Sequence, residues 1–437
     1  MTASQTSTGA PEAPFHVHRL ANGLQILGQR MPDLESVSFC FHVRTGSRDE
    51  YDPALYGVSH FLEHMVFKGT QHRDAEQITL DFNTMGAEFN AFTSVEQTVY
   101  YARVLGEYLP RAVDLLSDMM RPRLDAHDFD LERNVILEEI ARSEDLPSNQ
   151  AIRKLLATYF DGTSLSHEVL GTRESIRDLQ VEQMRAYWER RYAANNLIAS
   201  IAGNFEWPRL IELLEEKTSG WTTGEAGRDA QPFQPTMSQS RVIVKPKQQQ
   251  QIMLLSWPSV SQEDPDLRAA ALAAMVLGDS TGSRLFWNIF QKGLAEAASA
   301  SLSPFDHTGM MLAYISTTPE QAPAVLELVR AELKGMQDDG VHEDELRRAK
   351  DKLVSHAVLD GESAFSRMRD LADTWVAEGR LRTIDEEVAL MEAVSLADVR
   401  RVLDRFPYTE PHIFTAYGPL EASAFGIESE AVAEREE

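Results

Sequence analysis

Two kinds of apolar pattern alternate along this chain. Apolar residues three and four apart predict amphipathic helices, and alternating or short continuous apolar runs predict strands. In the first part of the chain these patterns predict strands through 98–101 and at 196–202, and helices at 131–144 and 208–216. Later they predict strands at 251–257 and 309–316, and helices at 266–277, 321–336, 343–359 and 363–378. The chain therefore reads as a mixed α and β protein.

The segment 224–238 separates two stretches of similar pattern. It is rich in Gly, Pro, Gln and Thr and has no apolar period, which is typical of a linker. A chain of 437 residues is also too long for one hydrophobic core. We therefore predict an internal repeat: a tail at 1–14, one domain at 15–223, a second at 239–420, and an acidic tail at 421–437 that is disordered towards its end.

Composition places the chain among ordinary globular proteins. It is 43% hydrophobic and 25% charged, and no apolar run approaches the ~20 residues that cross a bilayer. The first fourteen residues have neither a basic start nor an apolar centre, so we expect no signal peptide, and they lack the arginines of a mitochondrial presequence. A single cysteine, Cys40, excludes an internal disulfide framework and falls in an apolar strand pattern. We expect a cytoplasmic protein.

The formal net charge of −26 limits the classes of partner that the protein is expected to bind. It argues against nucleic acid and against anionic membrane surfaces, both of which would be repelled. It could favour basic or neutral peptides by long-range attraction, although solubility alone is a sufficient explanation of the charge.

The chemistry concentrates in the string His60-Phe61-Leu62-Glu63-His64. On a helix, residues four apart share one face, so His60 and His64 can present two imidazoles to one metal. Glu63 lies one step round that face, where it can reach a water beside the metal. The order H-x-x-E-H is the reverse of the commoner H-E-x-x-H zinc-protease pattern. An exposed helix that carries two histidines by chance is the alternative.

A hydrolytic zinc site needs a third protein ligand and an open position for water. The helix predicted at 131–144 offers glutamates for this role. Glu132 and Glu139 are two turns apart and share a face, whereas Glu138 points away from both. From the residues alone, either member of the pair could bind the metal, and both could equally be solvated surface groups.

With these motifs in place, the chain resembles peptidase family M16, the pitrilysin and mitochondrial processing peptidase group, along nearly its whole length. The resemblance rests on four segments, which are LANGLQIL at 20–27, GVSHFLEHMVFKGT at 57–70, GAEFNAFTS at 86–94 and the 132–139 helix. It implies an α+β fold of two homologous domains, each a mostly antiparallel sheet packed with helices, arranged as half of a clamshell. Residues 270–277 of the second half are simply apolar, so only the first copy keeps the metal motif.

The resemblance also implies roles for the site residues. It makes His60, His64 and Glu139 the ligands of one Zn²⁺ per chain, Glu63 the general base, and Glu132 a supporting glutamate that does not ligate. Zinc would polarise the scissile carbonyl and lower the pKa of a water towards ~7. Glu63 would take the proton of that water and pass it to the departing amine. The expected activity is that of a zinc endopeptidase.

The segment after Gly86 has the alternation of a strand. An exposed strand edge can bind an extended peptide through main-chain hydrogen bonds. The resemblance places Asn90, Ala91 and Thr93 on such an edge, close to the substrate backbone. Phe89 and Phe92 are better explained as the half-buried residues of an ordinary strand.

The second half departs from the family pattern. Family members commonly carry an Arg and, seven residues later, a Tyr that together bind substrate, but here these positions hold Ile289 and Glu296. Arg284 belongs to a Ser-Arg-Leu turn and reads as structural. Family members split between two chains place zinc in one subunit and the Arg/Tyr pair in the other. We therefore predict a heterodimer in which this chain is the zinc-bearing subunit.

Three alternatives remain. A homodimer could hold its substrate through other groups, for example Arg284 or Lys292. A non-catalytic scaffold, like the core subunits that this fold supplies to respiratory complexes, would have lost its metal ligands, and here they are all present. A metal enzyme that acts on something other than peptides is also possible, because fold does not fix function.

Overall fold

The computed structural model describes residues 15–228, 230, 232–233, 238–409, 413–427 and the backbone of 432–435. The predicted tail 1–14 lies outside these residues, as do parts of the predicted linker 224–238 and of the predicted tail 421–437. Within the described part, no helix is both long and apolar enough to cross a membrane.

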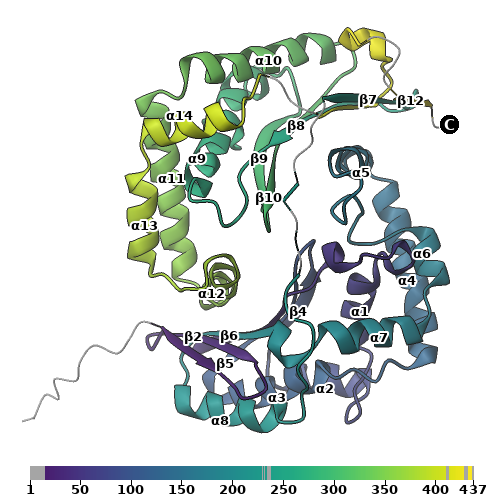
Figure 1. The fold of residues 1–437 in the computed structure, drawn as a ribbon, viewed down its shortest axis with the longest axis vertical. Helices are drawn as coiled ribbons and strands as arrows, with labels where there is room; N and C mark the ends of the chain where they lie inside the picture. Colours follow the sequence, from purple (N-terminus) through teal and green to yellow (C-terminus); the bar gives the residue numbers. More distant parts are fainter. Residues whose placement is uncertain are drawn as a thin grey trace, which may run out of the picture.

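The described part of the chain contains two six-stranded sheets (Figure 1). The first has the order β1-β2-β6-β3-β5-β4 and the second β12-β7-β11-β8-β10-β9. The strands of the first sheet are β1 His16–Arg19, β2 Gln25–Arg30, β3 Ser36–Val43, β4 Glu88–Thr93, β5 Thr98–Leu105 and β6 Leu197–Gly203. Those of the second are β7 Gln239–Val244, β8 Gln251–Pro258, β9 Ala297–Phe305, β10 Thr308–Thr317, β11 Ile413–Gly418 and β12 Val432–Arg435.

Apart from the edge strands β1 and β12, the two sheets repeat one topology. In the first, β2 and β6 pair in parallel and the other neighbours are antiparallel. In the second, β7 and β11 form the matching parallel pair, with β8, β10 and β9 antiparallel beyond them. The predicted α+β repeat of mostly antiparallel sheets is confirmed.

Helices pack on the sheets in both halves (Figure 1). The first half contains α1 Val58–Val66, α2 Ala75–Thr84, α3 Leu109–Met119, α4 Ala126–Glu144, α5 Pro147–Tyr159, α6 Arg173–Asp178, α7 Val181–Arg191 and α8 Trp207–Thr218. The second contains α9 Leu267–Gly278, α10 Ala322–Asp339, α11 Glu343–Gly361, α12 Ala364–Glu378, α13 Ile384–Ala393 and α14 Leu396–Arg405. The elements predicted from the apolar pattern agree within a few residues, except that α4 begins at Ala126 and not at 131. The Asp125 carboxylate caps this extra turn by accepting from the backbone of His127 and Asp128.

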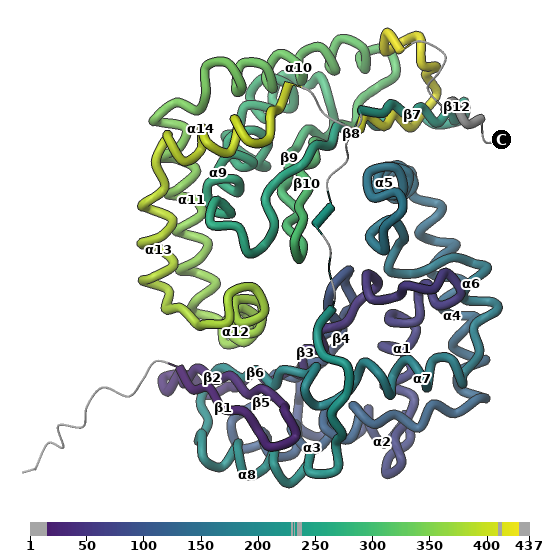
Figure 2. The backbone as a smooth tube through the Cα atoms, viewed as in Figure 1, coloured from purple at the N-terminus to yellow at the C-terminus, as the bar shows by residue number. Residues whose placement is uncertain are grey.

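One helix from each half packs on the sheet of the other half (Figures 1 and 2). Helix α12 packs on β6, β3 and β2 of the first sheet, and α5 packs on β11 and β8 of the second. Leu371 and Ala372 of α12 are buried against Leu27 and Ile198. The halves are therefore joined by two hydrophobic interfaces as well as by the connecting chain.

A buried ion-pair network, which we call the seam network, lies where the halves meet. Arg228, from the connecting segment, bonds Asp49 at 3.0 Å and approaches Asp306 of the second half at 3.5 Å. Arg191 also reaches Asp49, at 3.3 Å. Since breaking a buried pair leaves an uncompensated charge, this network opposes separation of the halves.

The predicted acidic tail needs correction where the structure describes it. Phe425 is buried in the second core beside Phe414, with ring centroids 5.5 Å apart, so packing continues past residue 420. Val432–Arg435 form β12, which pairs in parallel with β7. The prediction of disorder is wrong for these four residues, because an open sheet edge accepts backbone hydrogen bonds whatever the side chains.

The exchanged helix allows a test of stability. We expect Leu371→Ala to lower the free energy of unfolding by about 2–5 kcal/mol, because it leaves a cavity between α12 and the first sheet. Urea denaturation measures the change. Leu359→Ala, at a side chain 63% exposed on α11, is the control and should change it by less than about 0.5 kcal/mol. Equal effects of the two substitutions would contradict this packing role.

Candidate metal centre

Helix α1 presents the two histidines on one face, as predicted. Their imidazole centroids lie 4.7 Å apart. The helix begins after Gly57, whose φ of 89° is left-handed and suits glycine. Its apolar residues, among them Phe61, Leu62 and Met65, are buried in the first core, and Phe61 stacks on Phe129 of α4 at 4.5 Å. This packing holds α1 against α4.

Glu139 of α4 completes a three-residue group with the histidines. Its Oε2 lies 3.7 Å from His60 Nε2 and 3.8 Å from His64 Nε2. Three ligand atoms of one tetrahedral zinc are separated by about 3.3–3.4 Å, so a small contraction would close the cage. Two imidazoles and one carboxylate are the donor set of a catalytic zinc site with an open fourth position. The residues therefore fit zinc.

The state of His60 suits metal binding. Burial, together with nearby His64, lowers the pKa of His60 to about 4. The ring is therefore neutral near pH 7, which is the form that binds a metal.

Glu132 supports the site from behind His64. Its Oε1 lies 2.7 Å from His64 Nδ1, and its Oε2 accepts from Lys68 Nζ at 2.5 Å. Burial opposes ionisation of Glu132, but the hydrogen bonds from His64 and Lys68 outweigh it and lower the pKa of this carboxyl. A carboxylate on Nδ1 leaves Nε2 of His64 free to face Glu139. The sequence did not reveal Lys68, which lies two residues beyond the end of α1.

Glu63 lies beside the three-residue group and is not part of it. Thr93, the last residue of β4, donates its hydroxyl to Glu63 Oε2 at 2.6 Å. Burial raises the pKa of Glu63, while the Thr93 hydrogen bond and the charge of His64 oppose the rise. A carboxylate with a raised pKa is suited to accept and then release a proton.

The predicted peptide-binding strand is an edge. β4 pairs only with β5 in the described sheet. Asn90 is exposed on it, and its Oδ1 accepts from the backbone of Ala91. Phe89 stacks on Phe82 with centroids 4.0 Å apart, and both Phe89 and Phe92 are half-buried, as expected. Thr93 differs from the expectation in one respect, because its hydroxyl contacts Glu63.

The structure describes the two positions where the Arg/Tyr pair was expected, and also Arg284. Ile289 is fully buried, and Glu296 accepts a hydrogen bond from Gln250. Arg284 makes a two-pronged contact with Glu345 of α11, at 2.8 and 2.7 Å. The structural interpretation of Arg284 is confirmed.

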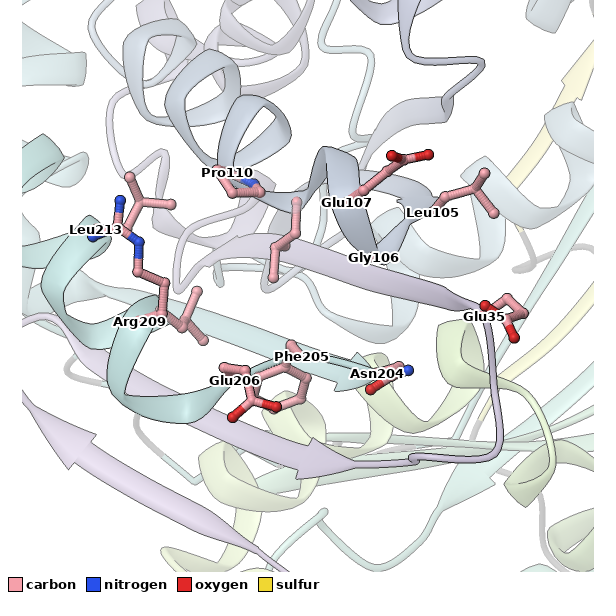
Figure 3. Close-up of a pocket in the computed structure, with 12 residues that line it drawn as sticks. Glu35, Leu105, Gly106, Glu107, Pro110, Asn204, Phe205, Glu206, Arg209 and Leu213 are labelled. Carbon is pink, nitrogen blue, oxygen red and sulfur yellow. The ribbon is translucent and has the colours of Figure 1, made fainter.

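A separate cavity lies at the far end of β3 and β5 (Figure 3). It measures about 420 Å³, and the N-terminal turns of α3 and α8 border it. Glu35, Glu107, Glu206 and Arg209 contribute its charged groups. None of the residues of the metal centre lines this cavity, so it is not part of that centre.

The fold and the centre together define a two-domain metallopeptidase architecture, and the comparisons agree. The family model for insulinase (peptidase family M16) matches residues 26–173, and that for the peptidase M16 inactive domain matches residues 178–353. The chain belongs to peptidase family M16.

Several relatives that match this chain along nearly its whole length are named zinc proteases. An uncharacterized zinc protease of Streptomyces coelicolor is 32% identical, over 92% of this chain and 89% of its own length. The uncharacterized zinc protease YmxG of Bacillus subtilis is 30% identical, over 91% and 97%. These similarities assign the chain to the zinc metallopeptidases of family M16.

Solved structures share the fold. The peptidase M16 inactive domain from Pseudomonas fluorescens superposes with a TM-score of 0.87 at 19% identity, covering 93% of this chain and 98% of its own. A Helicobacter pylori protease gives 0.84 at 19% identity, covering 92% and 98%. A chain of complex III2 from Candida albicans gives 0.77 at 16% identity, covering 93% and 96%.

Glu132 offers a test of the centre. We expect Glu132→Gln to weaken zinc binding about 10–100-fold, because the amide cannot hold both His64 and Lys68 as the carboxylate does. Competition with a chromophoric chelator measures the affinity. Glu138→Gln, on the solvent side of the same helix, is the control and should bind zinc like the parent protein. Unchanged affinity in Glu132→Gln would remove Glu132 from the centre.

Proposed function

We propose that this chain is a zinc endopeptidase that hydrolyses short or unfolded peptides. His60, His64 and Glu139 would hold one zinc, and Glu63 would act as the base. The observation that carries the proposal is the convergence of three ligand atoms, from His60, His64 and Glu139, within 4.8 Å of one another. The Glu63 carboxylate is close enough to His64 and Glu139 to interact with their charges.

The residues of the chain divide the chemistry between them. Zinc, when bound, would supply a Lewis acid for the scissile carbonyl and lower the pKa of a water. Glu63 would take a proton from the attacking water and donate it to the departing amine. Thr93 would hold the Glu63 carboxylate in place through its hydroxyl. The burial that raises the pKa of Glu63 supports its role in both proton transfers.

The substrate would bind as an added strand on β4. Main-chain groups on the free edge of β4 can pair with an extended peptide of almost any sequence. Asn90 and Ala91 lie in the middle of this edge, and β4 ends at Thr93, which touches the base. This continuity from the edge to Glu63 favours a peptide over a compact small molecule as substrate. It also requires the peptide to be extended, and so short or unfolded.

A heterodimer with an Arg/Tyr-bearing M16 chain is the assembly we favour. Ile289 is buried, and Arg284 is engaged by Glu345, so neither is available to hold a substrate. Of the cations suggested for a homodimer, Lys292 is left, and its amino group contacts Asn288 at 3.3 Å. The scaffold alternative is disfavoured because the ligand group is complete.

The purified chain alone tests the function. We expect about one zinc per chain. If the chain cleaves a quenched mixed-peptide library, Glu63→Gln should keep the zinc and lower the rate roughly 10²–10⁴-fold, because the base is lost. His64→Ala should lose both zinc and cleavage.

The outcomes separate the alternatives. Cleavage that a chelator abolishes would establish a self-sufficient peptidase and defeat the obligate partner. Zinc without cleavage would point to a partner that supplies the missing Arg and Tyr. A Glu63→Gln variant that cleaves at the parent rate would overturn the mechanism.

Thr93 gives a second test, in a chain or complex that cleaves peptide. We expect Thr93→Val to lower kcat about tenfold with little change in KM, because a hydrogen bond to the base is lost while the strand edge stays. Thr93→Ser keeps the hydroxyl and should restore most of the rate. If KM rises in Thr93→Val while kcat is unchanged, Thr93 binds substrate and does not position the base.

A further inference from the structure

The two histidines of the centre are held in different ways. His64 is fixed through its side chain, because Nδ1 meets Glu132, which is held in turn by Lys68. His60 Nδ1 is buried without a hydrogen-bond partner among the residues described. Metal-binding histidines usually have such a partner to orient the ring. The orientation of His60 must therefore come from its backbone and its packing.

The backbone around His60 is the first turn of α1, and this turn has an unusual cap. The N-cap residue is Gly57, which has no side chain to satisfy the first N–H groups. Glu50, seven residues earlier, takes over this task. Its Oε2 accepts from the Gly57 backbone at 2.7 Å, and its Oε1 accepts from the Ser59 backbone at 2.8 Å.

Glu50 is itself held firmly. It is fully buried, and its Oε2 is hydrogen-bonded to His167 Nε2 at 3.1 Å. The His167 ring stacks on Tyr56 with centroids 3.7 Å apart and planes 6° from parallel. The preceding residue, Asp49, belongs to the seam network through Arg191 and Arg228. Glu50 therefore connects the start of α1 to His167 and, through the preceding residue Asp49, to the seam network.

We infer that Glu50 is the positioning residue of His60. It fixes the first turn of α1 and so places the His60 imidazole for zinc, as Glu132 does for His64 from the side-chain end. His167 supports Glu50 from the loop after α5. This inference rests on the proposed zinc site, and it assigns to Glu50 a task beyond capping a helix.

The test uses the full chain with Zn²⁺ and Co²⁺ as probes. We expect Glu50→Gln to weaken zinc binding about tenfold, because one acceptor is lost and the first turn loosens. The visible absorption of the Co²⁺-loaded protein should also change in position and intensity, since it reports ligand geometry. A loss of stability alone would leave this spectrum unchanged.

Asp266→Asn is the matched control. Asp266 is a buried carboxylate of the second half, paired with Arg401 and Arg405. Its replacement removes a comparable buried charge far along the chain from α1. We expect parent zinc affinity and the parent Co²⁺ spectrum in this variant. An equal loss in both variants would overturn the inference.

A further variant keeps the inference testable. If Glu50→Gln does not fold, His167→Phe keeps an aromatic ring on Tyr56 and removes the third hydrogen bond to Glu50. It should weaken zinc binding less than tenfold but measurably, and parent affinity would overturn the inference. A parent chain that binds no zinc would instead overturn the proposed function.

Discussion

The exchange of helices α5 and α12 between the halves is the interaction on which the rest of the structure depends. Each sheet buries one face under the helices of its own half and the other under a helix of the opposite half. Neither sheet could keep both faces out of water alone, so the two halves form one hydrophobic structure. The seam network adds directional contacts at the same boundary, where Arg228 lies between Asp49 and Asp306.

The contact between the halves is connected to the metal centre through neighbouring residues of the chain. Asp49 belongs to the seam network, and the next residue, Glu50, caps α1. His167, in the loop after α5, is hydrogen-bonded to Glu50. The position of α1 is thus tied to the contact between the halves, and α4 supplies the remaining groups from the opposite side. The two helices α1 and α4 can hold a precise site because buried packing and hydrogen bonds restrain both.

The second half repeats the strand order of the first but lacks the H-x-x-E-H motif at the corresponding helix. The helix α9 that corresponds to α1 is packed with alanine and leucine, and the segment that follows directs Ile289 into the core. Selection for packing alone would produce such a pattern. The two halves therefore share a topology, but α9 carries no counterpart of the two histidines of α1.

The sequence by itself determined what is set within one element. The two histidines one helical turn apart, the carboxylate between them and the repeated pattern of strands and helices follow from local periodicity, and all were predicted. The start of α4 was missed because a single cap, Asp125, decides it. From the residues alone, Glu132 and Glu139 were equivalent, since both share one face of α4. Only the tertiary structure decided that Glu139 faces both Nε2 atoms and Glu132 faces Nδ1, that Thr93 reaches Glu63, and that Glu50 caps α1. These contacts join residues far apart in sequence, and their geometry depends on how whole elements pack, which no local pattern records.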